Sequence, residues 1–143
     1  MPEETGGPYL SAALLCDTVL EDKSGTLSLI RIVDRLNVSP PPGAPERMPP
    51  TPFNTHLVVS FKSGMARGQY TLRITITSPS GAEATHLTLP VLFEGEDRGV
   101  NAVVRLEMVL EEYGLFWFGV YLNDVPFTRI PLRVVYHRIG IAG

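Results

Sequence analysis

The sequence predicts an all-β protein: an antiparallel β-sandwich of about eight strands, immunoglobulin-like or jelly-roll-like, with little or no helix. Three observations predict this fold. Apolar and polar residues alternate along several segments, turn-forming residues recur at short intervals, and no segment has the period of an amphipathic helix. At 143 residues and 44% hydrophobic, the chain can form one domain with a proper core. We expect a single domain spanning residues 1–143.

The clearest strands show strict alternation. Residues 70–77 place Tyr70 and three aliphatic side chains on one face and threonine or arginine on the other. Residues 101–110 repeat the pattern, and their β-branched valines disfavour a helix. By the same criteria we predict further strands at residues 10–20, 26–36, 55–62, 84–93, 115–122 and 125–138.

Turn residues separate these segments. Residues 21–25, with a terminal glycine, close an amino-terminal hairpin, and Asn123-Asp124 forms a two-residue turn before the last strand. We also expect turns at residues 63–68, 78–81, 94–99 and 111–114. Within residues 26–36 the apolar positions shift from Leu27 and Leu29 to Ile30 and Ile32, which predicts a β-bulge.

A proline-rich stretch interrupts this regular spacing. Seven of the thirteen residues from 40 to 52 are proline, which excludes both helix and central strand. We therefore predict a surface loop over residues 39–54 and a flexible amino terminus over residues 1–9. Pro42 and Pro45 have the Pro-x-x-Pro spacing of a docking peptide, but such spacing is inevitable at this density, so a stiff crossover between sheets is the favoured interpretation.

Charge and cysteine content restrict the partners. The net charge of -3 lacks the concentrated positive charge of nucleic-acid binders. No apolar run approaches the length of a membrane-spanning helix, and the amino terminus does not resemble a signal peptide. A single cysteine, Cys16, excludes an intrachain disulfide. We expect a cytoplasmic protein that binds neither nucleic acid nor membrane.

We find no catalytic motif in the sequence. Phosphate-binding, dinucleotide-binding, serine-hydrolase and zinc-protease patterns are all missing. His56, His86 and His137 lie in separate predicted strands, Cys16 has no neighbouring positive charge, and the acidic cluster at Glu94, Glu96 and Asp97 lacks the spacing of a calcium loop. We therefore expect no enzymatic activity, no cofactor and no metal.

Residues 115–122, Leu-Phe-Trp-Phe-Gly-Val-Tyr-Leu, are apolar on both faces of the predicted strand. One interpretation is a central strand whose second face packs under the proline-rich loop or a chain terminus. The other is an outward patch with Trp117 and Tyr121 that meets a second subunit or a partner. On the last strand, Arg129, Arg133 and His137 share one face, which is a solvated face or a basic strip for an acidic partner. Pro131 places that strand at an edge or interrupts it.

Several segments resemble a bacterial family of unknown function. They are Ala-Leu-Leu-Cys-Asp at residues 13–17, Gly-Thr-Leu-Ser-Leu-Ile at 25–30, Ile-Val-Asp at 32–34, Tyr-Leu-Asn-Asp-Val at 121–125 and Ile-Pro-Leu-Arg-Val at 130–134. The resemblance implies a small all-β protein that begins with a strand pair and ends with a hairpin. It implies no activity, cofactor or catalytic residue.

These observations favour a non-enzymatic protein-binding or assembly module. It would act as an adaptor or as a subunit of a larger bacterial or phage-related complex, through a protein partner or self-association. The candidate surface comprises Trp117, Tyr121, Arg129 and Arg133, with Pro42 and Pro45 as a second region. The alternative is a β-sandwich that binds a carbohydrate or an apolar molecule on Trp117, Tyr121 or Tyr113.

Overall fold

The computed structural model describes residues 6–138, apart from the side chain of Asp97. The predicted all-β fold is confirmed, because the described residues form strands and no helix. The part of the flexible amino terminus predicted for residues 1–5 lies outside the described residues. The seven strands are β1 (Tyr9–Glu21), β2 (Leu27–Val33), β3 (Arg35–Val38), β4 (Thr51–Thr77), β5 (Glu83–Leu110), β6 (Gly114–Leu122) and β7 (Val125–Tyr136).

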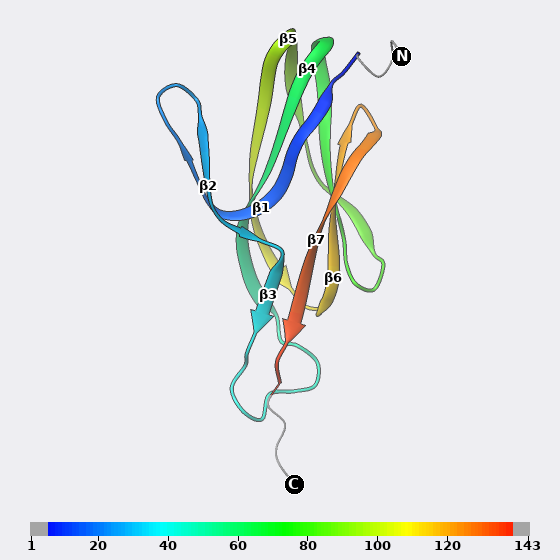
Figure 1. The fold of residues 1–143 in the computed structure, drawn as a ribbon. Coiled ribbons are helices and arrows are strands. Elements are labelled where there is room, and N and C mark those ends of the chain that lie inside the picture. Colours follow the sequence, from blue (N-terminus) through cyan, green and yellow to red (C-terminus); the bar gives the residue numbers. More distant parts are fainter. Residues whose placement is uncertain (1–5, 139–143) are drawn as a thin grey trace.

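The strands form one sheet that curls on itself into two facing layers (Figure 1). In the first layer, β1 pairs with β2 and with the first half of β4, which pairs in turn with the second half of β5. In the second layer, the first half of β5 pairs with the second half of β4, followed by β6, β7 and β3. All pairs are antiparallel except β3 with β7.

Seven strands replace the eight predicted segments, because β4 and β5 each join two predicted segments and one predicted segment, residues 26–36, divides in two. Residues 63–68 and 94–99, predicted as turns, do not reverse the chain: pairing between β4 and β5 continues through them, with register shifts around Gly64. Gly64, Gly95 and Glu96 have positive φ there, which bends the hairpin from one layer into the other. Glycine and polar residues thus mark a corner here and not a turn.

The predicted strand at residues 26–36 divides into β2 and β3, because the chain leaves the first layer at Asp34 and joins the second. The extra residue of the predicted bulge in β2 is not found, because the pairs with β1 keep one register on both sides of Arg31. The strand is nevertheless irregular at Arg31, which has a φ of 61° and is missing from the pairs, and Leu27, Leu29 and Val33 stay on one face. Ile30 and Ile32 lie on the other face, 43% and 64% exposed. The amino-terminal hairpin and its turn are confirmed, with Gly25 N–H donating to Asp22 O.

The core lies between the two layers. Leu57, Phe61, Leu72, Ile74 and Phe118 have no exposed surface, and each such side chain contributes roughly 1.5–3 kcal/mol through burial. The proline-rich loop lies at one end of the layers, between β3 and β4 (Figure 1). It ends earlier than predicted, because Thr51 already pairs with Leu110. Buried Met48 anchors the loop.

The last hairpin follows the sequence expectations closely. Asn123 and Asp124 form its turn with φ of 47° and 65°, which is the conformation of a tight β-hairpin turn. Pro131 lies on β7 just before the residues that pair with β3, beginning with Arg133. Arg133 N–H donates to Asp34 O, on the β3 side of β7. Residues two apart on a strand direct their nitrogens to the same side, so the nitrogen of Pro131 also faces the β3 side. β3 does not extend as far as Pro131, so no ladder hydrogen bond is lost there. β7 is therefore not interrupted at Pro131, which pairs with Trp117, but at this residue its other side is a free edge of the described sheet, as the edge alternative expects.

Candidate functional site

Strand β6 presents one buried and one accessible face. Phe116, Phe118, Val120 and Leu122 are buried against the core, whereas Trp117 and Tyr121 are half-buried on the outer face with Gly119 between them. The outer face does not lie under the proline-rich loop, since no residue of that loop lines the hollow beside Trp117. Among the described residues, Trp117 and Tyr121 thus lie outward, as the second interpretation of this strand expects, and their contact with a partner stays a prediction.

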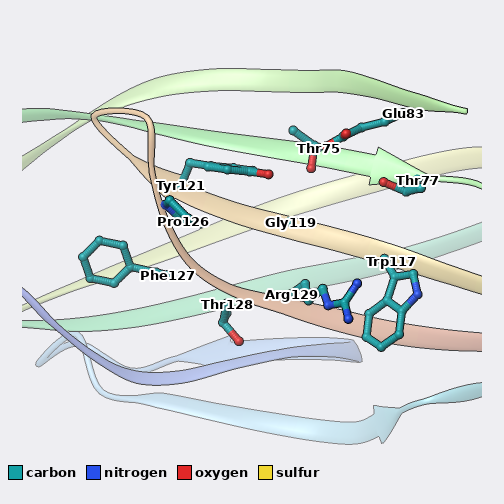
Figure 2. Close-up of a pocket in the computed structure, with 10 residues that line it drawn as sticks. All are labelled: Thr75, Thr77, Glu83, Trp117, Gly119, Tyr121, Pro126, Phe127, Thr128 and Arg129. Carbon is teal, nitrogen blue, oxygen red and sulfur yellow. The ribbon is translucent and has the colours of Figure 1, made fainter. Parts of the chain in front are cut away.

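The register of the second layer builds a pocket around these aromatic residues (Figure 2). Gly119 pairs with Thr75 on β4 and with Arg129 on β7, and Trp117 pairs with Thr77. A cavity of about 510 Å³ opens over these rows. Its lining residues come from β4, β5, β6 and β7 and are Thr75, Thr77, Glu83, Trp117, Gly119, Tyr121, Pro126, Phe127, Thr128 and Arg129.

Gly119 forms the floor of this pocket. A Cβ atom at this position would lie 2.4 Å from Thr75 Oγ1, closer than real contacts allow, and 3.0 Å from Tyr121 Cε1, closer than most. The absence of a side chain therefore lets the Tyr121 ring and the Thr75 hydroxyl approach the backbone of β6. We call this close approach at Gly119, between Trp117 and Tyr121, the Gly119 notch.

Each aromatic ring on this face is stacked with an arginine. The Arg129 guanidinium lies 4.0 Å from the centroid of the Trp117 ring, and the Arg73 guanidinium lies 4.1 Å from that of Tyr121. Such cation–π contacts are worth about 0.5–1 kcal/mol at exposed sites. Arg73 is further held by Asp124, with 3.4 Å between Nε and Oδ1. We call Arg73, Trp117, Gly119, Tyr121 and Arg129 the aromatic–arginine face.

The positive charge continues along β7. Arg133 lies four residues beyond Arg129 on the same side of the strand and pairs with Arg35 of β3. Arg35, Arg129 and Arg133 are all exposed. Glu83 lies at the opposite rim of the pocket, on β5, three strands away from β7. The face is therefore positive along β7 and carries one carboxylate at its β5 side.

The other predicted contact residues lie elsewhere. Pro42 and Pro45 are exposed in the proline-rich loop, where Pro45 O accepts a hydrogen bond from Tyr136 Oη at 2.8 Å. Tyr113 stacks on Tyr136, with ring centroids 5.6 Å apart, beside a second hollow of about 460 Å³ lined by Glu46, Glu111 and Glu112 among others. Neither Tyr113 nor any residue of the proline-rich loop lines the pocket beside Trp117. The structure thus brings together Trp117, Tyr121 and Arg129 but not Pro42, Pro45 or Tyr113.

His56, His137 and Cys16 have separate surroundings in the structure. His56 Nδ1 lies 2.9 Å from Asp17 O on the first layer, and His137 Nε2 lies 3.0 Å from Asn37 Oδ1 on the second. No group of three or more His, Cys, Asp or Glu among these residues could hold a metal ion. Cys16 is a buried free thiol, and burial together with the neighbouring Asp17 carboxylate raises its pKa. A thiol with a raised pKa is a poor nucleophile at neutral pH.

Three site residues were not predicted from the sequence: Arg73, Thr75 and Gly119. Arg73 and Thr75 appear in the sequence only as the polar half of an alternating strand. Their role depends on the pairing of β4 with β6, which the local pattern does not specify. Gly119 could have been noticed, because a glycine inside an otherwise bulky strand often marks a close approach.

The comparisons with solved structures support the fold. A β-glucosidase from Listeria innocua in complex with glucose matches with a TM-score of 0.52 and 10% identity, over 92% of this chain. The chain spans 17% of that enzyme's length, so the likeness concerns one portion of it. No helix that could cross a membrane occurs in the part of the chain that the structure describes.

Two further structures match more weakly. An alkylpurine DNA glycosylase from Pseudomonas fluorescens, bound to DNA with an abasic site analogue, has a TM-score of 0.46 at 8% identity, with 86% of this chain and 30% of that chain covered. An immunoglobulin-like protein from Pseudomonas aeruginosa has a TM-score of 0.38 at 14% identity, with 91% and 98% covered.

The comparison with curated proteins finds no matching relative. A family model does match, over residues 11–135, and its description is a family of unknown function, DUF6941. This range includes all the segments on which the resemblance to an uncharacterised family depends, from Ala13 to Val134. The chain therefore belongs to the family of unknown function DUF6941.

Proposed function

We propose that this protein is a non-enzymatic binding module that contacts a protein partner through the aromatic–arginine face. The observation that carries the proposal is the pair of arginine–aromatic stacks on either side of the Gly119 notch. Tryptophan, tyrosine and arginine dominate the energetic centres of protein interfaces. Stacking fixes the arginine side chains before a partner arrives, which reduces the entropy lost on binding.

The surroundings of the notch support the same role. Polar threonine and glutamate side chains lie at its rim, so the notch resembles an interface centre with a polar periphery. The partner is a different protein or a second copy of the chain, and the module acts as an adaptor or subunit of a larger bacterial or phage-related complex. A cytoplasmic location fits one free, buried thiol.

Native mass spectrometry of the protein purified gently from its source tests this proposal. We expect a homo-oligomer or a complex with a defined partner, and we expect the Trp117→Ala variant to lose it while keeping the wild-type circular-dichroism spectrum. Val109→Ala is the matched control, because Val109 is 64% exposed on the first layer. A monomer without partners at high concentration, in both wild type and control, would contradict the proposal.

One observation favours a second function, the binding of a carbohydrate or an apolar molecule. The cavity of about 510 Å³ lies within the range of small-molecule sites, and Trp117, Tyr121 and Phe127 supply aromatic lining. A thermal-shift panel of sugars and lipids on wild type and Trp117→Ala distinguishes the two functions. Stabilisation of the wild type alone, by a sugar or lipid, would favour the small ligand over the protein partner.

A further inference from the structure

We infer that the partner of the aromatic–arginine face presents an acidic, extended polypeptide segment, and that one of its carboxylates enters the pocket beside Trp117 and meets Arg129. This inference rests on the proposed function and specifies the chemistry of the partner. It is carried by the hydrogen-bond donors that line the pocket and by the charge along β7.

Donors from three strands line the pocket beside Trp117: Thr75 on β4, Tyr121 on β6 and Arg129 on β7. The position of the Arg129 guanidinium is fixed by the Trp117 ring, 4.0 Å from its centroid. Two hydroxyl groups and a guanidinium that line one pocket match an acceptor with two oxygens, such as a carboxylate.

The charge of this face also indicates an acidic partner. Within the described residues, the ion pairs involve Arg31, Arg67, Arg73, Arg98 and Arg105, whereas no carboxylate pairs with Arg129 or Arg133. The chain as a whole carries a net charge of -3, so the arginines along β7 form a local positive band against the overall sign. A band of this kind attracts an acidic surface and speeds its association.

The spacing along β7 explains why a polypeptide fits better than a single small anion. Arg129 and Arg133 are four residues apart on one strand, which corresponds to roughly 13 Å. An extended partner segment lying along β7 would match both with acidic residues at positions i and i+4. Glu83 lies at the β5 side of the pocket, in the row of Trp117 and Pro131, so it disfavours an acid at that side and directs the segment towards Arg133.

Selection of displayed random dodecapeptides against the full chain tests this inference. We expect the enriched peptides to share aspartate or glutamate, with a preferred spacing of four residues. Replacing those acids by glutamine should weaken binding about tenfold or more, because each loses a charge-assisted hydrogen bond. Arg129→Gln should weaken the binding of the parent peptides by a similar factor.

Arg105→Gln is the matched control, since it makes the same charge change on an exposed arginine of the first layer. It should alter binding less than twofold. Enriched peptides that lack acids but still depend on Trp117 would overturn the acidic partner and leave the proposed function standing. If no enriched peptide binds the wild type more tightly than it binds Trp117→Ala, both the acidic partner and the proposed function are overturned.

Discussion

The Arg129 guanidinium lies 4.0 Å from the centroid of the Trp117 ring, on the outer face of the second layer. The two residues come from neighbouring strands, β6 and β7, and are offset by one pair, since Trp117 pairs with Pro131 and Arg129 with Gly119. Diagonal neighbours on adjacent strands are within reach of long and aromatic side chains. This arrangement holds the Arg129 guanidinium in a fixed position next to an accessible indole.

Replacing Arg129 by alanine should expose the indole without unfolding the protein. Trp117 is the single tryptophan of the chain, so the intrinsic tryptophan fluorescence comes from this site alone. We expect emission to shift to longer wavelength and quenching by acrylamide to increase, while the free energy of unfolding falls by about 1 kcal/mol or less. Arg105→Ala should leave the emission unchanged; a shift of equal size there would refute the stack as its cause.

Gly119→Ala should destabilise the protein by roughly 1–3 kcal/mol, although alanine normally suits a strand better than glycine. The added Cβ meets Thr75 Oγ1 at 2.4 Å. Removing that hydroxyl in the double variant Thr75→Ala/Gly119→Ala should restore part of the loss, as measured by urea unfolding. If the second change brings no recovery, the clash with Thr75 is not the origin of the effect.

Ser63→Ala should leave stability unchanged or raise it by up to about 1 kcal/mol. Ser63 Oγ is buried without a hydrogen-bond partner among the described residues, so the fold carries its desolvation cost without compensation. Thr55→Val is the contrasting variant, because Thr55 Oγ1 donates to Cys16 O at 2.9 Å in a buried position. It should lower the free energy of unfolding by about 1–2 kcal/mol, and equal behaviour of the two variants would contradict this account.

Asp124→Gly should stabilise the β6–β7 hairpin by about 0.5–1 kcal/mol. Asp124 has a φ of 65°, which glycine adopts without steric cost. The ion pair with Arg73 is lost, but the Asp124 side chain is 87% exposed, so this loss is small. Asn123→Ala should have the opposite effect, because the Asn123 carboxamide accepts a hydrogen bond from Thr71 N–H at 2.8 Å. Thermal melts of both variants check the prediction.

The pKa of Cys16 predicts a pH dependence in the alkaline range. Burial and the Asp17 carboxylate raise this pKa, while a backbone hydrogen bond from Thr18 opposes the shift. Because the folded value lies above the unfolded one, the stabilisation is complete below the unfolded pKa and is lost as pH rises through the folded pKa. Cys16→Val should flatten the decline of stability at alkaline pH relative to wild type, and native Cys16 should react slowly with iodoacetamide at pH 8.

The sequence by itself determined the local structure of this protein. Alternation at residues 70–77 and 101–110 predicted strands because a half-buried strand needs one polar and one apolar face. Turn chemistry placed the hairpins at Gly25 and at Asn123-Asp124 because few residues adopt their backbone conformations. The two apolar faces of residues 115–122 also identified the strand that carries the candidate site.

The tertiary structure decided which of these elements meet. Residues 63–68 and 94–99 contain turn residues, yet pairing between β4 and β5 carries both segments through a corner, since ladder hydrogen bonds continue on each side. Arg73, Thr75 and Gly119 form one site only because β4 pairs with β6 in a particular register. Register is set by long-range packing of the core faces, which no local pattern records, and for that reason the Gly119 notch could not be derived from the sequence.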